Sequence, residues 1–168
     1  MAPVAVLVGS PGAGKSSVGR RVAERLGVPF ADSDALIESA AGMSVSDIFI
    51  TLGEDEFRRL EADAVARALD EHSGVLSLGG GAVLREQTRQ RLAGVRVVWL
   101  RVSVSDAASR VGLNTARPLL LGNVRATLSS LLDQRNPIYE SVATDVVDTS
   151  GRSLREVTEE VLKVVRGE

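Results

Sequence analysis

The chain has 168 residues, 44% of them hydrophobic and 25% charged, which is enough for one domain with a buried core. It contains no cysteine, which excludes a disulfide framework and a thiolate metal site. The net charge of −2 gives no general reason to bind nucleic acid, and no stretch resembles a signal peptide or a membrane span. These features predict a soluble, cytoplasmic protein that binds neither nucleic acid nor membranes.

Apolar runs of strand length alternate with helical patterns along the chain. The runs predicted as strands are 4–8, 28–31, 75–78, 95–102 and 145–148. The predicted helices occupy 17–26, a segment that Gly42 ends, a short segment after Ser44, a longer one from Gly53 to about Asp70, 85–92, a segment ending near Gly112, 124–132, and the segment after Ser153. This alternation predicts an α/β fold in which helices cover both faces of a parallel sheet.

Several helix ends carry recognisable capping residues. Ser33 or Asp34 is expected to cap the helix that Gly42 ends, and Ser44 caps the next helix. Ser153 with Glu156 three residues later forms a capping box. Pro137 is expected to interrupt or kink the helix of residues 124–132.

Residues 9–16 read Gly-Ser-Pro-Gly-Ala-Gly-Lys-Ser and fit the phosphate-binding pattern G-x-x-x-x-G-K-[ST]. Its glycines, Gly9, Gly12 and Gly14, allow consecutive backbone N–H groups to curl around an anion. Lys15 reaches the β- and γ-phosphates, and the Ser16 hydroxyl can ligate Mg²⁺. The following helix points its positive end at the same anion. We therefore expect a nucleoside-triphosphate site.

The residues after the other strands narrow the class of P-loop protein. The chain lacks the N-K-x-D sequence of regulatory GTPases, and the strand at 75–78 ends in Gly79 to Gly81 instead of the Asp-Glu of large ATPases. Asp32 remains as the metal-side carboxylate, acting through water. Since ligands bind beyond the carboxyl ends of parallel strands, Asp32, Asp34, the glycines and the P-loop are expected to share one cleft. This favours a small kinase.

Over essentially its whole length the chain resembles a shikimate kinase. The resemblance rests on the P-loop, Asp32-x-Asp34, Phe57-Arg58 with Glu61, Gly79 to Gly81, Arg117-Pro118-Leu119-Leu120, and Arg135 followed by Pro137 and Tyr139. It implies transfer of the ATP γ-phosphate to the 3-hydroxyl of shikimate, on the route to aromatic amino acids. It also implies the nucleoside-monophosphate-kinase fold, with strand order 2-3-1-4-5, in a monomer whose residues 1–168 form one domain.

The resemblance also implies residue roles. ATP would be bound by Gly12, Ala13, Gly14, Lys15, Ser16, Ser17, Arg110, Arg117 and Arg152, with Arg110 and Arg152 flanking the adenine. Mg²⁺ would be held by Ser16 and, through water, by Asp32. Shikimate would contact Asp34, Phe49, Phe57, Arg58, Glu61, Gly79, Gly80, Gly81, Pro118 and Arg135. Residues of about 34–72 would form the substrate-binding insertion and about 112–123 a closing lid, and the catalytic residues would be Lys15, Asp34 and Arg117.

Other interpretations remain open at this stage. The chain could be another small-molecule kinase of the same fold, acting on gluconate or a nucleoside monophosphate, or a non-catalytic nucleotide-binding module. Taken alone, Arg58 could pair with Glu54 on a solvated helix face, and Asp34 could serve only as a helix cap.

Overall fold

The computed structural model describes the backbone of residues 2–113 and 121–168, and the side chains of 2–110 and 125–168. Within these residues, five strands form one parallel sheet of order β2-β3-β1-β4-β5. The strands are β1 (Ala5–Val8), β2 (Phe30–Asp32), β3 (Val75–Ser77), β4 (Val97–Arg101) and β5 (Asp145–Asp148). The predicted α/β class and strand order are confirmed.

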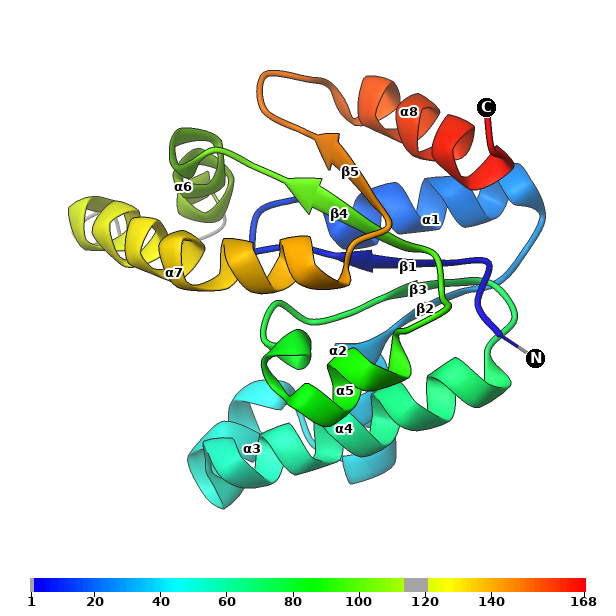
Figure 1. The fold of residues 1–168 in the computed structure, drawn as a ribbon. Coiled ribbons are helices and arrows are strands. Elements are labelled where there is room, and N and C mark those ends of the chain that lie inside the picture. The colour runs from blue at the N-terminus through cyan, green and yellow to red at the C-terminus, as the bar shows by residue number, and fades with distance from the viewer. Residues whose placement is uncertain (1, 114–120) are drawn as a thin grey trace.

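Helices cover both faces of this sheet (Figure 1). One face carries α1 (Lys15–Leu26) and α8 (Leu154–Arg166), and the other carries α4 (Glu54–Glu71), α5 (Glu86–Arg91) and α7 (Leu121–Val142). The remaining helical segments are α2 (Ser33–Ala41), α3 (Val45–Leu52), η1 (Ala82–Leu84) and α6 (Val104–Leu113). The α6 helix packs on α7, and α3 packs on α4.

The core is divided by the sheet into two apolar layers. Successive side chains of a strand point to opposite faces, and β1 follows this rule. Leu7 packs with α1 and α8, whereas Val6 and Val8 pack with α4 and α7. All four β1 residues are buried, so the loop that leaves this strand begins from a fixed position at the centre of the sheet.

The cap of α2 differs from the prediction. Asp32 caps the helix, and its carboxylate accepts a hydrogen bond from the Asp34 N–H at 2.9 Å. Asp32 still has extended backbone angles, φ −122° and ψ 129°, whereas Ser33 is already helical, so the predicted caps at Ser33 and Asp34 are wrong. The consequence is functional, because the Asp34 side chain is not used for capping. The predicted caps at Ser44 and Ser153 are confirmed.

The predicted interruption at Pro137 is also wrong, because α7 runs unbroken from Leu121 to Val142, and the alternative of a kink there stays a prediction. Proline removes a helical N–H and crowds the carbonyl four residues earlier, which destabilises a helix interior by about 3 kcal/mol. Leu132 and Tyr139, on either side of Pro137, are both buried, so packing offsets this cost. The helix therefore keeps buried side chains on both sides of the proline.

No single helix among the described residues is long and apolar enough to cross a membrane. Within the same part of the chain, α2 and α3 taken together have the required length and composition but are bent by 60°.

Candidate active site

The phosphate-binding loop leaves β1 with the geometry that its glycines require. Gly12 and Gly14 have φ values of 84° and 86°, in the left-handed region that favours glycine. No side chain of the described residues caps the start of α1, so its first N–H groups are available to an anion.

Lys15 is the cation of this loop. Its ammonium group donates to the carbonyl oxygens of Gly9, at 2.8 Å, and Ser10, at 3.1 Å. Burial lowers the pKa of Lys15 to about 8, and the negative charges of Asp32 and Asp34 only partly oppose this shift. The ammonium group is thus held in a site where a phosphate would stabilise its charge.

Ser16 and Asp32 supply oxygen atoms beside the loop. The Ser16 hydroxyl donates to one carboxylate oxygen of Asp32 at 2.6 Å. Hydroxyl and carboxylate oxygens suit Mg²⁺, which usually keeps several water ligands and takes others from substrate phosphates. The described residues contain no cluster of three or more His, Cys, Asp or Glu side chains that could hold a metal. Ser16 and Asp32 could supply two oxygen atoms to a Mg²⁺ ion that takes its other ligands from water and phosphates.

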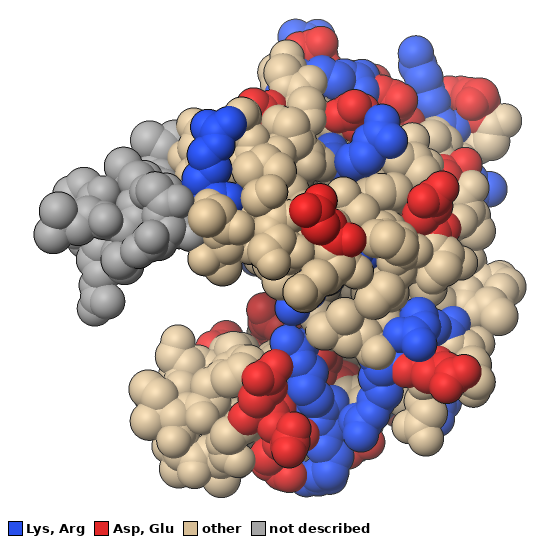
Figure 2. Space-filling view, turned by 60° about the vertical axis from the view of Figure 1, so that its left-hand side comes forward, with Lys and Arg blue, Asp and Glu red and all other residues tan. Residues whose placement is uncertain are grey.

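A cavity of about 390 Å³ joins the loop to the ends of β2 and β3. It is lined by Pro11, Gly12, Gly14, Lys15, Ser16, Ser17, Asp32, Asp34, Ser77, Leu78, Gly79, Gly80 and Arg110. The predicted meeting of these segments in one cleft is confirmed. Figure 2 shows the molecule hollowed between its upper and lower parts, with acidic and basic side chains gathered beside the hollow.

Asp34 and Gly79 lie together in this cavity. A Cβ atom built on Gly79 would lie 2.9 Å from Oδ1 of Asp34 and 3.2 Å from Oε2 of Glu61, so a side chain at this position would displace a carboxylate. Burial, and then the negative charge of Asp32, raises the pKa of Asp34. Asp34 is thus a partly desolvated carboxylate that faces the cavity and is suited to accept a hydrogen bond or a proton.

Arg58 lies beside Gly81, where a Cβ atom would come within 2.5 Å of the guanidinium. Its Nη1 contacts Oε1 of Glu61 at 2.7 Å, whereas its Nε is 3.8 Å from Glu54. The Glu61 side chain is only 4% exposed and that of Glu54 is 67% exposed, so Glu61 is the partner that fixes the guanidinium. Burial raises the pKa of Glu61, and Arg58 opposes this rise.

Two aromatic rings pack beside this ion pair. The ring centroids of Phe49 and Phe57 are 4.5 Å apart, and the Arg58 guanidinium lies 5.3 Å from the Phe57 centroid. Phe57 is buried, whereas Phe49 is 37% exposed.

Arg135 reaches the same glycine turn from α7. A Cβ atom on Gly80 would lie 3.2 Å from Nη1 of Arg135 and 3.2 Å from Pro11 of the phosphate-binding loop. The Tyr139 hydroxyl donates to the Gly80 carbonyl at 2.6 Å. Tyr139 was part of the resemblance but was not assigned to the site, although it follows Arg135 by one helical turn, which is a spacing that places both on one face.

A second cavity of about 240 Å³ lies on the other side of the loop. It is lined by Ala13, Gly14, Ser17, Val18, Arg110, Thr149, Arg152, Leu154 and Val157. Arg110 donates to the carbonyl oxygens of Gly12, at 2.8 Å, and Thr149, at 3.1 Å. Arg152 donates to the Asp148 carbonyl at 2.9 Å and pairs with Glu160.

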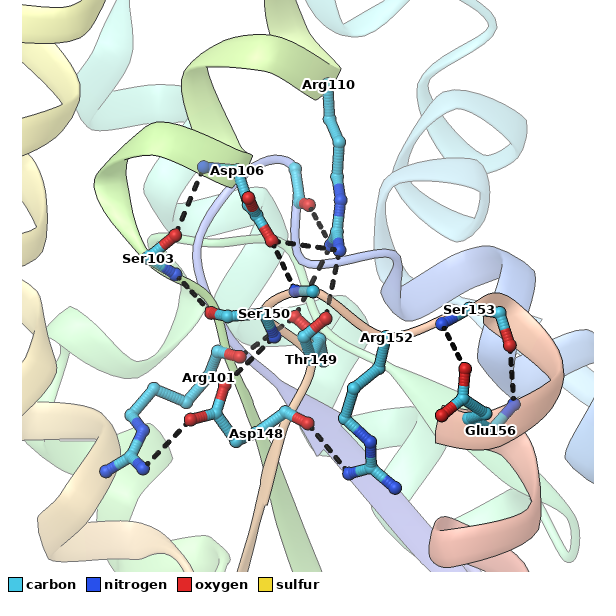
Figure 3. Close-up of polar contacts among 12 residues, drawn as sticks. Arg101, Ser103, Asp106, Arg110, Asp148, Thr149, Ser150, Arg152, Ser153 and Glu156 are labelled. Carbon is cyan, nitrogen blue, oxygen red and sulfur yellow. Dashed lines mark hydrogen bonds and ion pairs between the residues drawn. The ribbon is translucent and has the colours of Figure 1, made fainter.

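Asp106 is a residue of this region that the sequence did not single out. Its Oδ2 accepts a hydrogen bond from the Gly151 N–H at 2.7 Å and lies 4.0 Å from Nη2 of Arg110 (Figure 3). It therefore ties α6 to the loop between β5 and α8. The sequence signal was weak, because Asp106 resembles an ordinary acidic residue in the first turn of a helix.

The structure thus places the described nucleotide residues of the prediction around two adjoining cavities. It places Asp34, Glu61, Arg58 and Arg135 around the glycine turn, with Phe57 and Phe49 beside Arg58. Arg117 and Pro118 lie outside the described residues.

A phosphate-binding loop after the central strand, a sheet of order 2-3-1-4-5, and a carboxylate facing the loop define a P-loop phosphotransferase of the nucleoside-monophosphate-kinase fold. The sequence model for "Shikimate kinase" matches residues 11–166, so the chain belongs to the shikimate kinase family and is a kinase. This membership decides against a gluconate kinase, a nucleoside-monophosphate kinase or a non-catalytic module.

Individual relatives agree with the family match. The chain is 60% identical to a shikimate kinase of Thermobifida fusca, over 96% of this chain and 94% of the relative. It is 56% identical to that of Salinispora arenicola, over 96% of each. Among solved structures it is similar to the shikimate kinase from Acinetobacter baumannii in complex with shikimate, with 34% identity and a TM-score of 0.89 over 99% of this chain and 94% of that one.

Proposed function

We propose that this chain transfers the γ-phosphate of ATP to the 3-hydroxyl of shikimate, giving shikimate 3-phosphate and ADP for aromatic amino acid biosynthesis. The observation that carries the proposal is the convergence of Arg58, Arg135 and Asp34 on the glycine turn, next to the phosphate-binding loop. A planar guanidinium suits a carboxylate, and shikimate carries one carboxylate together with its hydroxyls.

On the nucleotide side, the N-terminal N–H groups of α1 and the Lys15 ammonium would bind the phosphates of ATP. Ser16, with Asp32 through water, would hold Mg²⁺, whose charge neutralises the phosphate oxygens. Arg110 and Arg152, which line the second cavity, would lie beside the adenine. Four further residues would contact ATP, and each of them lines one or both cavities: Gly12, Ala13, Gly14 and Ser17.

On the acceptor side, Asp34 would orient the 3-hydroxyl toward the γ-phosphate and take its proton as the bond to phosphorus forms. Arg58, held by Glu61, and Arg135 would bind the carboxylate, while Phe49 and Phe57 close the apolar side. The glycines at 79–81 allow the acceptor to approach the backbone closely.

Further assignments rest on the sequence resemblance. Residues of about 112–123 would form a lid that brings Arg117 to the transferring phosphoryl group and Pro118 to the acceptor, and about 34–72 would form the substrate-binding insertion. The protein would be a cytoplasmic monomer of one domain, and it would bind neither nucleic acid nor membranes.

A coupled assay of ADP formation tests it. With ATP and Mg²⁺, ADP should form at an appreciable rate only when shikimate is added, whereas gluconate and nucleoside monophosphates should give background rates. Equal turnover with any of these other acceptors would overturn the shikimate assignment. Nucleotide binding without turnover on any acceptor would instead support a binding module.

A further inference from the structure

Tyr139 is a core residue whose hydroxyl reaches the acceptor side, where it meets the Gly80 carbonyl and lies close to the Arg135 guanidinium. Its side chain is fully buried, and its ring lies 6.0 Å from that of Trp99 in the layer between the sheet and α7. Its hydroxyl donates to the Gly80 carbonyl oxygen at 2.6 Å. Burial raises the pKa of Tyr139, and the nearby Arg135 guanidinium only partly opposes this rise, so the hydroxyl keeps its proton and remains a donor at neutral pH.

The Gly80 α-carbon faces both Arg135 and the phosphate-binding loop. Nη1 of Arg135 and Cδ of Pro11 each lie 3.2 Å from the position of a Cβ atom on Gly80. A shift of this peptide in that direction would therefore press on the guanidinium and on the phosphate-binding loop. The Tyr139 hydroxyl holds the carbonyl end of the same peptide and comes from the helix that also carries Arg135.

The neighbouring glycines have other contacts. The Gly79 N–H donates to the buried Ser33 hydroxyl at 2.8 Å, and Gly81 packs on the Arg58 guanidinium. Loss of the Tyr139 hydroxyl would leave both of these contacts in place. The consequence should therefore be confined to Gly80 and to Arg135 beside it.

We propose that Tyr139 is a positioning residue for the acceptor, because its hydroxyl fixes the Gly80 peptide and thereby sets the place of the Arg135 guanidinium. The inference rests on the proposed function, in which Arg135 binds the acceptor carboxylate. It adds a residue that does not touch the substrate but determines how well the substrate is held.

The test is Tyr139→Phe, which removes the hydroxyl and keeps the ring packing. The KM for shikimate should rise about five- to tenfold, which is the size expected for one lost hydrogen bond. The kcat and the KM for ATP should stay within about twofold, because Lys15 and Asp34 are untouched. Calorimetric titration of shikimate should give the same loss of affinity without turnover.

Thr158→Val is the matched control. Thr158 is 4% exposed and its hydroxyl also donates to a backbone carbonyl, that of Leu154 at 2.7 Å, but it lies on α8 away from the acceptor. Both variants should lose a similar amount of thermal stability, and only Tyr139→Phe should change the shikimate KM. A Tyr139→Phe enzyme with the parental shikimate KM and a lowered Tm would overturn the inference and leave Tyr139 purely structural.

A double-mutant cycle checks the route. Because Tyr139 is inferred to act through Arg135, Tyr139→Phe should add less than about twofold to the shikimate KM of an Arg135→Lys enzyme. Fully additive effects would contradict that route. A parent enzyme that neither binds nor phosphorylates shikimate would refute the proposed function, whereas a failure limited to the variants would refute this inference.

Discussion

The pKa of Lys15 predicts how nucleotide affinity should depend on pH. The protonated ammonium binds phosphate oxygens, and its pKa is lowered to about 8 by burial in the loop. Bound phosphates would raise that pKa, since they stabilise the charged form. The affinity for the nucleotide should therefore be highest well below pH 8 and should fall as the pH rises through 8. Above this pH, Lys15 is largely neutral in the free protein and must take up a proton when the nucleotide binds.

The expected size follows from the protonated fraction of Lys15. With a pKa of about 8, roughly 90% of the lysine is charged at pH 7 and roughly 10% at pH 9. If the bound state keeps its proton over this range, the Kd for Mg-ADP should rise about tenfold from pH 7 to pH 9. At pH 8, binding should take up about half a proton. The nucleotide itself contributes little, since its terminal phosphate titrates near pH 6.

The assay is calorimetric titration with Mg-ADP at pH 7, 8 and 9, repeated in two buffers of different ionisation enthalpy to count protons. Lys15→Arg is the control, because a guanidinium stays charged throughout this range, and its affinity should be nearly independent of pH. A flat profile without proton uptake in the parent would refute the reasoning. It would mean that the carbonyl oxygens of Gly9 and Ser10, which accept from Lys15, compensate for its burial. An equal loss in the arginine variant would assign the titration to another group.

Three further substitutions test other parts of the site. Asp34→Asn should lower kcat by about 10²-fold or more with nearly normal Mg-ADP affinity, as for a lost general base, and a variant that keeps most of its kcat would exclude that role. Asp106→Ala should raise the KM for ATP severalfold and leave the KM for shikimate unchanged, because the Gly151 N–H loses its acceptor and Arg110 loses a neighbouring carboxylate. An unchanged KM for ATP would make Asp106 purely structural. Ser10→Ala should raise Tm by a few degrees, since the buried Ser10 hydroxyl has no hydrogen-bond partner among the described residues and burying one costs about 1–3 kcal/mol. A fall in Tm would instead reveal a partner for it.

The sequence predicted the fold well because its signals are local. Buried strands appear as short apolar runs, glycines and capping residues mark the helix ends, and the phosphate-binding loop has a fixed spacing. The two errors, at Asp32 and Pro137, arose where tertiary structure decided between local options. Asp32, Ser33 and Asp34 are consecutive residues whose side chains can all cap a helix, and the structure uses Asp32 for α2. In α7, the burial of Leu132 and Tyr139 keeps the chain helical across Pro137.

The site was predictable to the extent that it consists of motifs. Contacts made by ordinary residues across long separations were not predictable, because nothing in the local sequence of Ser33, Asp106 or Tyr139 identifies the backbone group each one meets. Their partners lie 46, 45 and 59 residues away along the chain. Only the fold brings these pairs together.

The glycine turn after β3 shows why this strand lacks the acidic ending of large ATPases. Each of its three residues meets a functional group from a different element where a Cβ atom would stand: Asp34 at Gly79, Arg135 at Gly80 and Arg58 at Gly81. A carboxylate in this turn would displace one of these groups and add negative charge beside Asp34, whose pKa is already raised by burial and by Asp32. In this chain the carboxylate beside the phosphate-binding loop comes instead from β2, where Asp32 accepts from Ser16. The glycine turn after β3 is thereby left without side chains, and the space is available for an acceptor molecule.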